Sequence, residues 1–568
     1  MTSRLQIKLI ASLSTKYISM KNCLLILIIA ATAAGCSANK QTYHAADGLT
    51  FFNKDSLSKN ISVLASDEFA GRKPFTEGEK KTIGYLKQQF MHAGLEPGNG
   101  NTYFQEVPMV NIHAISAPSM QLKSSMTNFD LKGREDFVIW TDKTDSEVSW
   151  NEDEVVFAGY GVVAPEYNWN DYEGLDVKGK IVLILVNDPG FNAGDTSLFK
   201  GNAMTYYGRW TYKFDEAGRQ GAKGCLIIHN TVAASYPFAV VQNNWNNSRL
   251  RLDNRGKTEK LCDIIGWVST EAASKILKAA GKDSTLLTTA DKRGFKAQPL
   301  KVRLTASLKV VSTYNRSHNV IGKITGSKYP DENIIYTAHW DHLGIGAPDE
   351  KGDTIYNGAL DNASGTAGLL EIARGFKNMK VKPERSVVFL AVTAEEQGLW
   401  GSAYYAQNPV YPANKTVANI NMDVLNWFGK TKDVVVIGQG QSELEDILAE
   451  EVKKVGRNIT FDARPQAGSY YRSDHFNFAK VGVPALYMKY GTSVIGKDAG
   501  YGLAVTESYT KNHYHRPSDD NSLATTNLEG AIDDLRLLFK VGRRLAFSNS
   551  WPAWKTGSEF KAVRDSSK

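Results

Sequence analysis

The sequence predicts an α/β protein: a doubly wound, mainly parallel sheet flanked by helices, interrupted by a β-rich insertion. After about residue 299, apolar segments of strand length alternate with helical segments, which is typical of βαβ crossovers. Between residues 151 and 263, β-rich runs are punctuated by Gly and Pro instead. A chain of 568 residues also exceeds what one hydrophobic core usually supports, so two domains are expected.

The main domain is expected to begin before the insertion. From about residue 56 to 94, apolar residues recur at amphipathic helical spacing, and an extended stretch follows near residues 103–110. We therefore assign residues 50–140 to the first part of this domain, residues 150–270 to the insertion and residues 295–550 to the second part.

Five strands and four helices are expected in the second part. The strands are expected at residues 333–338, 386–393, 417–422, 434–437 and 485–488, and the helices at residues 365–378, 401–407, 442–455 and 527–545. In a doubly wound sheet, ligands bind just beyond the carboxyl ends of the strands. Functional residues are therefore expected in the loops that follow these strands.

The charge pattern argues against one class of partner. The chain has 67 basic and 60 acidic residues, a net charge of +7, and its Lys and Arg residues are scattered. Binding a polyanion usually needs a dense basic cluster. We therefore expect no nucleic-acid partner.

The N-terminus predicts export. Met20 and Lys21 precede an apolar run at residues 23–34, which has the length of a signal-peptide core and is too short to span a bilayer. It ends in Ala33-Ala34-Gly35-Cys36, which resembles the bacterial lipoprotein box. We expect residues 1–36 to be a leader and a lipid on Cys36 to hold the protein at a membrane.

Two further points bear on this leader. The box usually begins with Leu, where this chain has Ala33, so cleavage without lipidation stays open. Ser37 follows the cysteine, and by the same resemblance it favours the outer membrane. The expected location is the bacterial cell envelope, facing the periplasm or the surface. Beyond the leader only Cys225 and Cys262 remain, and either one bridge or two buried thiols fits them.

Potential metal ligands and proton carriers follow the expected strands. His339 and Asp341 follow the first strand, Glu395 and Glu396 the second, Asp423 closes the third, and Asp361 and His515 lie in loops. Each alone has an ordinary explanation, such as a helix cap, a solvated surface or a loop residue. Their joint placement is what favours a single metal site.

The chemistry of these side chains suits a pair of zinc ions. Imidazole nitrogen and carboxylate oxygen both bind zinc, and two adjacent ions need a bridging carboxylate, for which Asp361 is the candidate. Two such ions, about 3.5–4 Å apart, can share a water, lower its pKa to about 7 and polarise a carbonyl group. Because Glu395 and Glu396 are consecutive, their side chains point differently, so one can bind metal while the other moves a proton.

Six ordered motifs resemble the M28 family of metallopeptidases, which includes bacterial aminopeptidases and glutamate carboxypeptidase-like enzymes. The motifs are Ala338-His-Trp-Asp-His342, Leu360-Asp-Asn-Ala-Ser-Gly365, Thr393-Ala-Glu-Glu-Gln-Gly398, Asn421-Met-Asp423, Ser473-Asp-His475 and Tyr514-His-Arg-Pro-Ser-Asp519. The resemblance covers nearly the whole mature chain. It implies the phosphorylase/hydrolase-like fold of zinc exopeptidases and two co-catalytic Zn²⁺ ions.

The resemblance also assigns the metal ligands by motif position. Glu396 and His515 would hold one ion, and His339 and Asp423 the other. Asp361 would bridge the two ions. A cis peptide bond is implied on the C-terminal side of Asp361.

Three further roles follow from the same resemblance. Glu395 would be the general base, and Asp341 would hydrogen-bond the ring of His339 and fix its tautomer. Tyr470 occupies the position at which a tyrosine stabilises the oxyanion in some members, although Tyr471 lies beside it. The other histidines of the motifs, His342, His475 and His513, are expected to be structural.

The insertion resembles a protease-associated domain, which is usually a lid or a substrate-shaping module. The segments that carry this resemblance are Phe157-Ala-Gly-Tyr-Gly-Val162, Val177-Lys-Gly-Lys-Ile-Val182 and Gly221-Ala-Lys-Gly-Cys-Leu-Ile227. The resemblance adds no catalytic residue to the main domain.

The resemblance implies an aminopeptidase that acts on peptides with a free N-terminus through a metal-bridged hydroxide. Three alternatives stay open. A glutamate carboxypeptidase-like enzyme would need an arginine cluster, for which Arg464 and Arg472 are candidates. The others are a glutaminyl cyclase and a non-catalytic binding protein. The chain has no G-x-S-x-G, H-E-x-x-H or G-x-x-x-x-G-K-[ST] motif.

Overall fold

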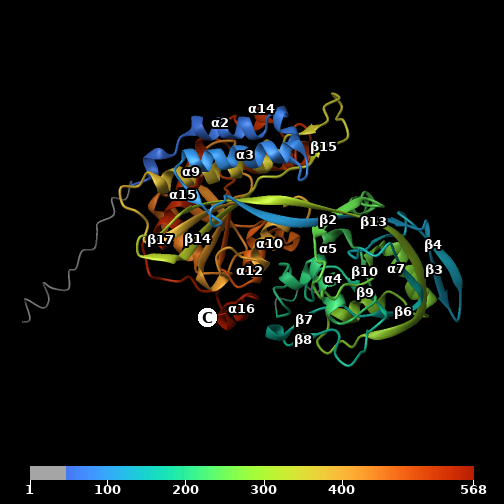
Figure 1. Cartoon of the computed structure of the whole chain (residues 1–568). Helices are drawn as coiled ribbons and strands as arrows, with labels where there is room; N and C mark the ends of the chain where they lie inside the picture. The colour runs from blue at the N-terminus through green and yellow to red at the C-terminus, as the bar shows by residue number, and fades with distance from the viewer. Residues whose placement is uncertain (1–46, 193–194, 196, 568) are drawn as a thin grey trace, which may run out of the picture. The chain divides into compact units, whose positions relative to one another are not determined.

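The computed structural model describes residues 47–192, 195 and 197–567 (Figure 1). The expected leader and the lipid on Cys36 lie outside these residues and stay predictions. Residues 48–568 form one compact unit. Within the described part, no helix combines the length and the apolar character needed to cross a membrane.

The main sheet is mostly parallel, as the sequence predicts. Strand β14 lies between β17 and β18, parallel to both, and β18 is parallel to β21. Antiparallel pairs join β13 to β17 and β19 to β21, and β19 pairs in parallel with β20. The strands are β13 (Gln298–Ile324), β14 (Tyr329–His339), β17 (Arg385–Val392), β18 (Thr416–Asn421), β19 (Asp433–Ile437), β20 (Asn458–Phe461) and β21 (Ala485–Tyr490).

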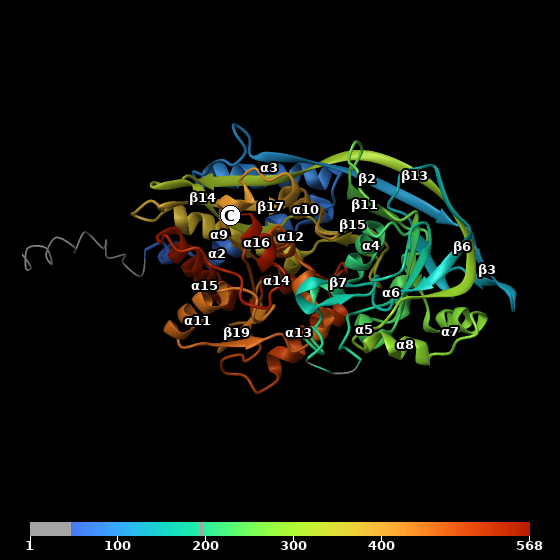
Figure 2. The same cartoon turned by 90° about the horizontal axis from the view of Figure 1, so that it is seen from below.

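Helices cover both faces of this sheet because its strands are apolar on both sides. Along β14, Ile334 and Tyr336 pack into the largest core cluster, and Ile335 packs into another. The first cluster is formed with α2 (Lys54–Leu64), α3 (Glu77–His92), α9 (Gly365–Lys377), α11 (Leu444–Lys454) and α15 (Glu529–Ala546), and the second with α10 (Trp400–Gln407) and α12 (His475–Lys480). Figure 2 shows α11 beside α15, which contact each other.

The strands of the inserted region continue the main sheet through β13, and the region also has helices that the sequence reading did not predict. Strands β6, β9, β10 and β12 lie side by side in this order, and each is parallel to the next. Strand β5 pairs antiparallel with β12. The elements are β5 (Phe137–Trp140), β6 (Glu147–Phe157), β9 (Ile181–Leu185), α4 (Trp210–Arg219), β10 (Gly224–Ile228), β11 (Ser248–Leu252), β12 (Ile264–Val268) and α7 (Thr270–Ala279). Cys225 and Cys262 are buried free thiols.

One long strand belongs to both regions. β13 spans 27 residues and precedes residues 333–338, where the sequence reading placed the first strand of the second part. It pairs antiparallel with β2 (Phe104–Ser116) over the whole length of β2, and it also pairs with β6 and β17. The two strands therefore run from the main sheet into the inserted region (Figure 1).

Candidate active site

The candidate ligands meet at the carboxyl edge of the main sheet. His339 is the last residue of β14 and lies opposite Val392, the last residue of β17. Thr337 lies opposite Asn421, the last residue of β18. The loops that carry the Glu395–Glu396 pair and Asp423 therefore leave the sheet beside His339, as the position of sites in doubly wound sheets predicts.

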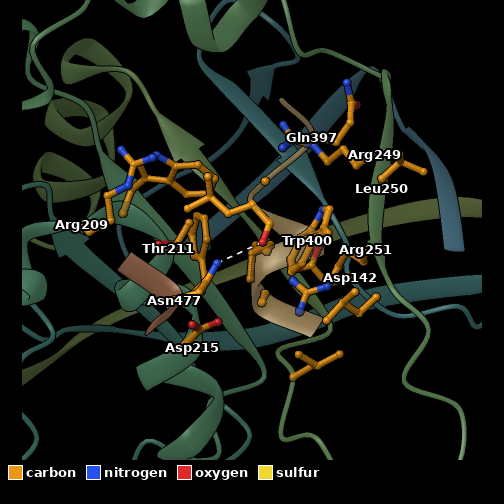
Figure 3. Close-up of a pocket in the computed structure, with 18 of the residues that line it drawn as sticks. Asp142, Arg209, Thr211, Asp215, Arg249, Leu250, Arg251, Gln397, Trp400 and Asn477 are labelled. Atoms are coloured by element: carbon orange, nitrogen blue, oxygen red, sulfur yellow. Dashed lines mark hydrogen bonds and ion pairs between the residues drawn. The ribbon is translucent and has the colours of Figure 1, made fainter. Parts of the chain in front are cut away.

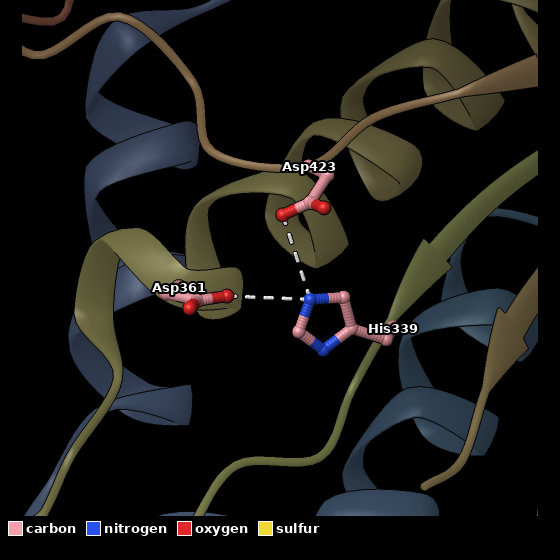
Figure 4. A group of neighbouring side chains, drawn as sticks. All are labelled: His339, Asp361 and Asp423. Carbon is pink, nitrogen blue, oxygen red and sulfur yellow. Dashed lines mark ion pairs between the residues drawn. The ribbon is translucent and has the colours of Figure 1, made fainter. Parts of the chain in front are cut away.

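His339, Asp361 and Asp423 form the first donor cluster (Figure 4). The ring nitrogen Nε2 of His339 lies 3.3 Å from Oδ1 of Asp361 and 3.5 Å from Oδ1 of Asp423. This nitrogen is buried and has no hydrogen-bond partner in the described structure. An imidazole nitrogen and two carboxylates that converge without a partner fit a divalent ion.

Asp361 also faces a second cluster with its other oxygen. Its Oδ2 lies 3.4 Å from Nε2 of His515, which is 3.0 Å from Oε2 of Glu396. The Nε2 of His515 likewise has no hydrogen-bond partner among the described residues. Asp361 therefore directs one oxygen at each histidine, which is the arrangement that a bridging carboxylate requires.

His342 lies closer to this second cluster than the sequence reading expected. Its Nδ1 is 2.7 Å from Oε1 of Glu396, and it forms a compact donor set with Asp361 and Glu396. The ring is fully buried, and neither of its nitrogens makes a hydrogen bond that the structure describes. The structure thus offers His342 as well as His515 as a partner of Glu396. His342 stands in the same motif as His339, which was the available signal.

The electrostatics of the two glutamates differ although they are neighbours. Burial raises the pKa of Glu395 well above its usual range, and the nearby charges of Asp423, Asp474 and Glu396 add to this effect. Burial also acts to raise the pKa of Glu396, but His515 and His342 outweigh it and bring the pKa to about 2. Glu396 is therefore suited to bind a metal ion as an anion, and Glu395 is the member of the pair that binds a proton more readily.

Asp341 does not orient His339 in the predicted way. The Nδ1 of His339 lies 3.2 Å from the main-chain oxygen of Asp341 and 3.7 Å from its carboxylate. The carboxylate instead accepts the main-chain N–H of Glu395 at 3.0 Å. The ring is thus held by a carbonyl group, while the Asp341 side chain fixes the loop that carries the two glutamates.

The loop of Asp361 is held from both sides. The expected cis peptide bond is present between Asp361 and Asn362. The carboxylate of Asp519 accepts the N–H groups of Leu360 at 2.9 Å and of Asp361 at 3.1 Å. The side chain of Asn362 donates to the carbonyl of Met422 at 3.0 Å, which ties this loop to the loop of Asp423.

Arg72 supports the site, and the sequence reading missed it. Its fully buried guanidinium donates to the carbonyl groups of Trp340, Asn357 and Gly358 at 2.5–2.8 Å. Trp340 directly follows His339, and Asn357 and Gly358 lead into the loop of Asp361. A fourth hydrogen bond reaches the main-chain carbonyl of Leu64 at 2.7 Å. No local motif marks Arg72, since it lies 268 positions before Trp340.

Tyr470 makes no hydrogen bond with the site carboxylates in the described structure. Its buried hydroxyl has no hydrogen-bond partner among the described residues, and burial followed by the charges of Glu559 and Glu445 raises its pKa. Its ring packs edge-to-face on the ring of His475, with ring centres 4.6 Å apart. The side chain lies in an aromatic cluster with Tyr471, Phe476 and Tyr487, and its oxyanion role stays a prediction.

Two other tyrosines contact residues of the site. The hydroxyl of Tyr487 is 3.4 Å from Oδ2 of Asp423. Tyr514 stacks on His515 with ring centres 3.8 Å apart. Tyr514 precedes His515 directly in the sequence, so the motif already contained this signal.

Sequence comparison finds one family model that covers the whole site. Residues 319–538 match peptidase family M28. Aminopeptidase YwaD of Bacillus subtilis is 32% identical over 195 residues, which is 33% of this chain and 38% of that protein. Carboxypeptidase Q of Bos taurus is 24% identical over 270 residues, or 43% of this chain and 53% of that protein.

Other relatives match over shorter segments or by structure. Aminopeptidase NAALADL1 of Rattus norvegicus is 32% identical over 155 residues, 26% of this chain and 19% of that protein. The solved aminopeptidase from Aneurinibacillus sp. strain AM-1 aligns with a TM-score of 0.47 and 20% identity, over 89% of this chain and 97% of that chain. The chain spans about a fifth to a half of the length of these curated relatives. Every candidate ligand lies within residues 319–538, the segment that matches peptidase family M28.

Proposed function

We propose that the protein is a two-zinc exopeptidase that removes N-terminal residues from peptides. The observation that carries this proposal is Asp361, whose two oxygens face His339 and His515 separately. Relatives named as aminopeptidases and as zinc metalloproteases support the same reaction class.

The donor set fits zinc in both number and type. Asp361 would bridge, His339 and Asp423 would complete one side, and Glu396 with His515 the other, where His342 is an additional candidate. Carboxylates also outweigh burial at His515 and raise its pKa to about 10, Glu396 first, so this position already favours a positive charge. Zinc bound there would supply the Lewis acidity that activates water and the scissile carbonyl group.

Glu395 is the residue that moves the proton in this proposal. It is buried, it does not belong to either donor cluster, and its raised pKa makes it a stronger base than an ordinary glutamate. It would take a proton from the attacking water and deliver it to the leaving amine. The hydrogen bond that the main-chain N–H of Glu395 donates to the carboxylate of Asp341 holds the backbone of Glu395 during this transfer.

The test uses wild type and Glu395→Ala on matched peptides with a free amine, an acetylated N-terminus or an acidic C-terminus. We expect cleavage of free-amine peptides only, reduced by about 10²–10⁴-fold in the variant. Zinc content should stay unchanged. Cleavage of N-acetylated acidic peptides would assign a carboxypeptidase instead, and inactivity of the zinc-loaded wild type on all peptides would support a binding protein.

A further inference from the structure

The proposed active site does not account for every cavity of the molecule. A cavity of about 530 Å³ reaches Glu396 and belongs to the surroundings of that site (Figure 3). A second cavity, of about 260 Å³, shares no lining residue with the first. We call this second one the basic cavity. Its charged lining residues are Lys430, Lys432, Arg457, Asp533, Arg536 and Lys540.

Four separate segments of the chain form the basic cavity. Residues 430–432 precede β19, residues 455–457 follow α11, and Ile495 follows β21. The fourth segment is part of α15, whose lining residues lie at Asp533 and three, four and seven positions after it, which is the spacing of one helix face. Basic residues that are scattered in the sequence therefore gather here only in the fold.

One carboxylate in the cavity wall is shared by two of the cations. Oδ2 of Asp533 lies 3.5 Å from Nζ of Lys430, and its Oδ1 lies 3.4 Å from a guanidinium nitrogen of Arg536. Lys432 and Lys540 form no ion pair with a carboxylate in the part of the chain that the structure describes. Two ammonium groups of the wall therefore lack a counter-charge.

Arg457 is a mostly buried cation of the cavity, with 10% of its side chain exposed. It donates to the carboxylate of Asp534, to the hydroxyl of Thr431 and to the main-chain carbonyl of Asp433, each at 2.7 Å. Its Nε is buried and has no hydrogen-bond partner among the described residues. A buried donor without a partner keeps hydrogen-bonding capacity for a ligand. Even with Asp534 counted, the five cations exceed the two carboxylates by three.

The excess of positive charge also acts on Lys540. Burial lowers the pKa of Lys540; Glu451 opposes this effect, and the charges of Arg543, Lys454 and Arg536 add to it. An ammonium group in such surroundings is stabilised by any anion that binds beside it.

Phosphate matches this cavity better than a carboxylate does. A phosphomonoester carries a charge of about −1.5 to −2 at pH 7 and three strong acceptor oxygens, so it comes closer to balancing three positive charges. Lys and Arg bind phosphate oxygens through charge-assisted hydrogen bonds. The cavity of about 260 Å³ is smaller than the usual sites of drug-sized ligands, about 300–1,000 Å³, so it suits one compact group.

We propose that the basic cavity binds a phosphate group through Lys432, Lys540 and Arg457. Inorganic phosphate and the headgroup of an anionic phospholipid present the same oxygens. Val455 and Ile495 line the cavity with 43% and 55% of their surfaces exposed, so a phosphate carried by a lipid would find apolar contacts beside the cations. The site is independent of the proposed peptidase function, because the basic cavity shares no residue with either donor cluster.

The first test locates inorganic phosphate on the zinc-loaded wild type by hydrogen exchange, with chloride at the same ionic strength as the reference. With a dissociation constant of about 1 mM, about 10 mM phosphate slows exchange by about tenfold. We expect this slowing in residues 430–432 and 455–457. Zinc can also bind phosphate, and slower exchange in the loops of Asp361 and Glu396 reports that other site.

The second test uses Lys432→Gln and Lys540→Gln, singly and together. Each single variant should weaken phosphate binding at the basic cavity by at least about threefold, and the double variant should lose the slowing in residues 430–432 and 455–457. The slowing at the zinc site should stay as in wild type. Lys309→Gln is the matched control, because it removes an exposed lysine of β13 that lies outside the cavity lining, and it should bind phosphate like wild type.

The third test distinguishes the two sources of phosphate by sedimentation with vesicles of phosphatidylcholine, with or without phosphatidic acid. The expected lipid anchor would bind both kinds of vesicle, so the ratio between them is the readout. A headgroup site predicts a ratio of about tenfold or more for wild type, since basic residues add to the attraction by an anionic surface, and a much smaller ratio for the double variant. A site for free phosphate predicts the same ratio for both proteins.

The variants decide whether any response belongs to the basic cavity. A response to inorganic phosphate or to phosphatidic acid that the double variant loses and Lys309→Gln keeps supports the site and identifies the source. No response in either arm overturns it. An equal loss in Lys309→Gln also overturns it, because the protein would then respond to net charge alone. Circular dichroism and zinc content establish that each variant is folded.

Discussion

Two regions of this molecule bury charged side chains, and they do so in opposite ways. In the inserted region, the fully buried Lys213 lies beside Asp171 and Asp188, and its ammonium donates to the carbonyl of Tyr160 at 2.5 Å. At the candidate active site, the ion-pair partners of Asp361 and its neighbouring carboxylates in the described structure are histidines alone. Burying carboxylates costs free energy unless cations compensate them.

The two clusters also differ in how many of their buried polar atoms have hydrogen-bond partners. Asp171 accepts hydrogen bonds from the N–H groups of Tyr160 and Val162 and from the indole of Trp169, at 2.9–3.1 Å. At the candidate site, the Nε2 atoms of His339 and His515 have no such partners among the described residues. The chain supplies a lysine to the first cluster, although Oδ1 of Asp188 has no hydrogen-bond partner among the described residues. The second cluster has no lysine or arginine ion-pair partner in the described structure.

Removing the metal should have the largest effect. Dialysis against a chelator is expected to abolish peptidase activity and to destabilise the fold by about 4 kcal/mol if free metal stood near 1,000 times its dissociation constant. Hydrogen exchange should show the loss around the Asp361 loop and not around Lys213. Equal loss of protection in both regions would contradict the distinction between them.

Lys213→Met should break the other cluster. It leaves two buried aspartates without their cation, so we expect the free energy of unfolding to fall by about 3–5 kcal/mol. Chemical denaturation measures this loss. Zinc content per folded chain should remain that of wild type, and a parallel loss of zinc would show that the two clusters are coupled.

Arg72→Met should weaken metal binding with a smaller effect. The four carbonyl groups that Arg72 holds lose their donor, and residues that orient ligands typically change metal affinity by about 10–100-fold. Competition with a chromophoric chelator gives the dissociation constant. Arg72→Lys should recover part of it, and unchanged affinity in a folded Arg72→Met protein would remove Arg72 from the account.

Asp188 offers the smallest effect, and it depends on pH. Burial raises the pKa of Asp188 to about 6 against the opposing bonds from Thr205, so the folded state takes up a proton that the unfolded state has lost. The stability that this group contributes is present below about pH 4 and is lost as pH rises through 6.

Asp188→Asn keeps an acceptor for Thr205, whose N–H and hydroxyl both lie 2.7 Å from Oδ2, and it cannot ionise. Its stability relative to wild type should therefore rise by about 1–3 kcal/mol between pH 4 and pH 7. Urea denaturation at matched pH values measures the difference. A difference that is independent of pH would mean that Asp188 is ionised throughout.

The sequence predicts the part of the site that depends on local pattern. His339, Asp423 and the Glu395–Glu396 pair follow apolar strands, so the strand pattern alone places them at one edge of the sheet. Asp361 and His515 join them through the family motifs. The strand alternation likewise predicts the parallel core of the sheet, because both faces of its strands are buried.

The remaining features depend on contacts between distant segments. Arg72 reaches the site from a segment far away in the sequence, and the hydrogen bonds of Asp519 to the Asp361 loop could not be inferred from its motif. The 27-residue strand β13 pairs with β2 along the whole length of β2. Asp341 was assigned to the ring of His339, but its carboxylate reaches the N–H of Glu395 instead. Packing decides whether the main-chain oxygen or the carboxylate of Asp341 faces the ring of His339. The sequence pattern does not describe that packing.

The most direct test of the two-metal site is zinc stoichiometry by elemental mass spectrometry, for wild type and for Asp361→Asn with its fold verified by circular dichroism. We predict two zinc ions per wild-type chain and fewer than one in the variant, because both donor clusters share Asp361. A wild type that binds no zinc, or a variant that keeps two ions, would contradict this account.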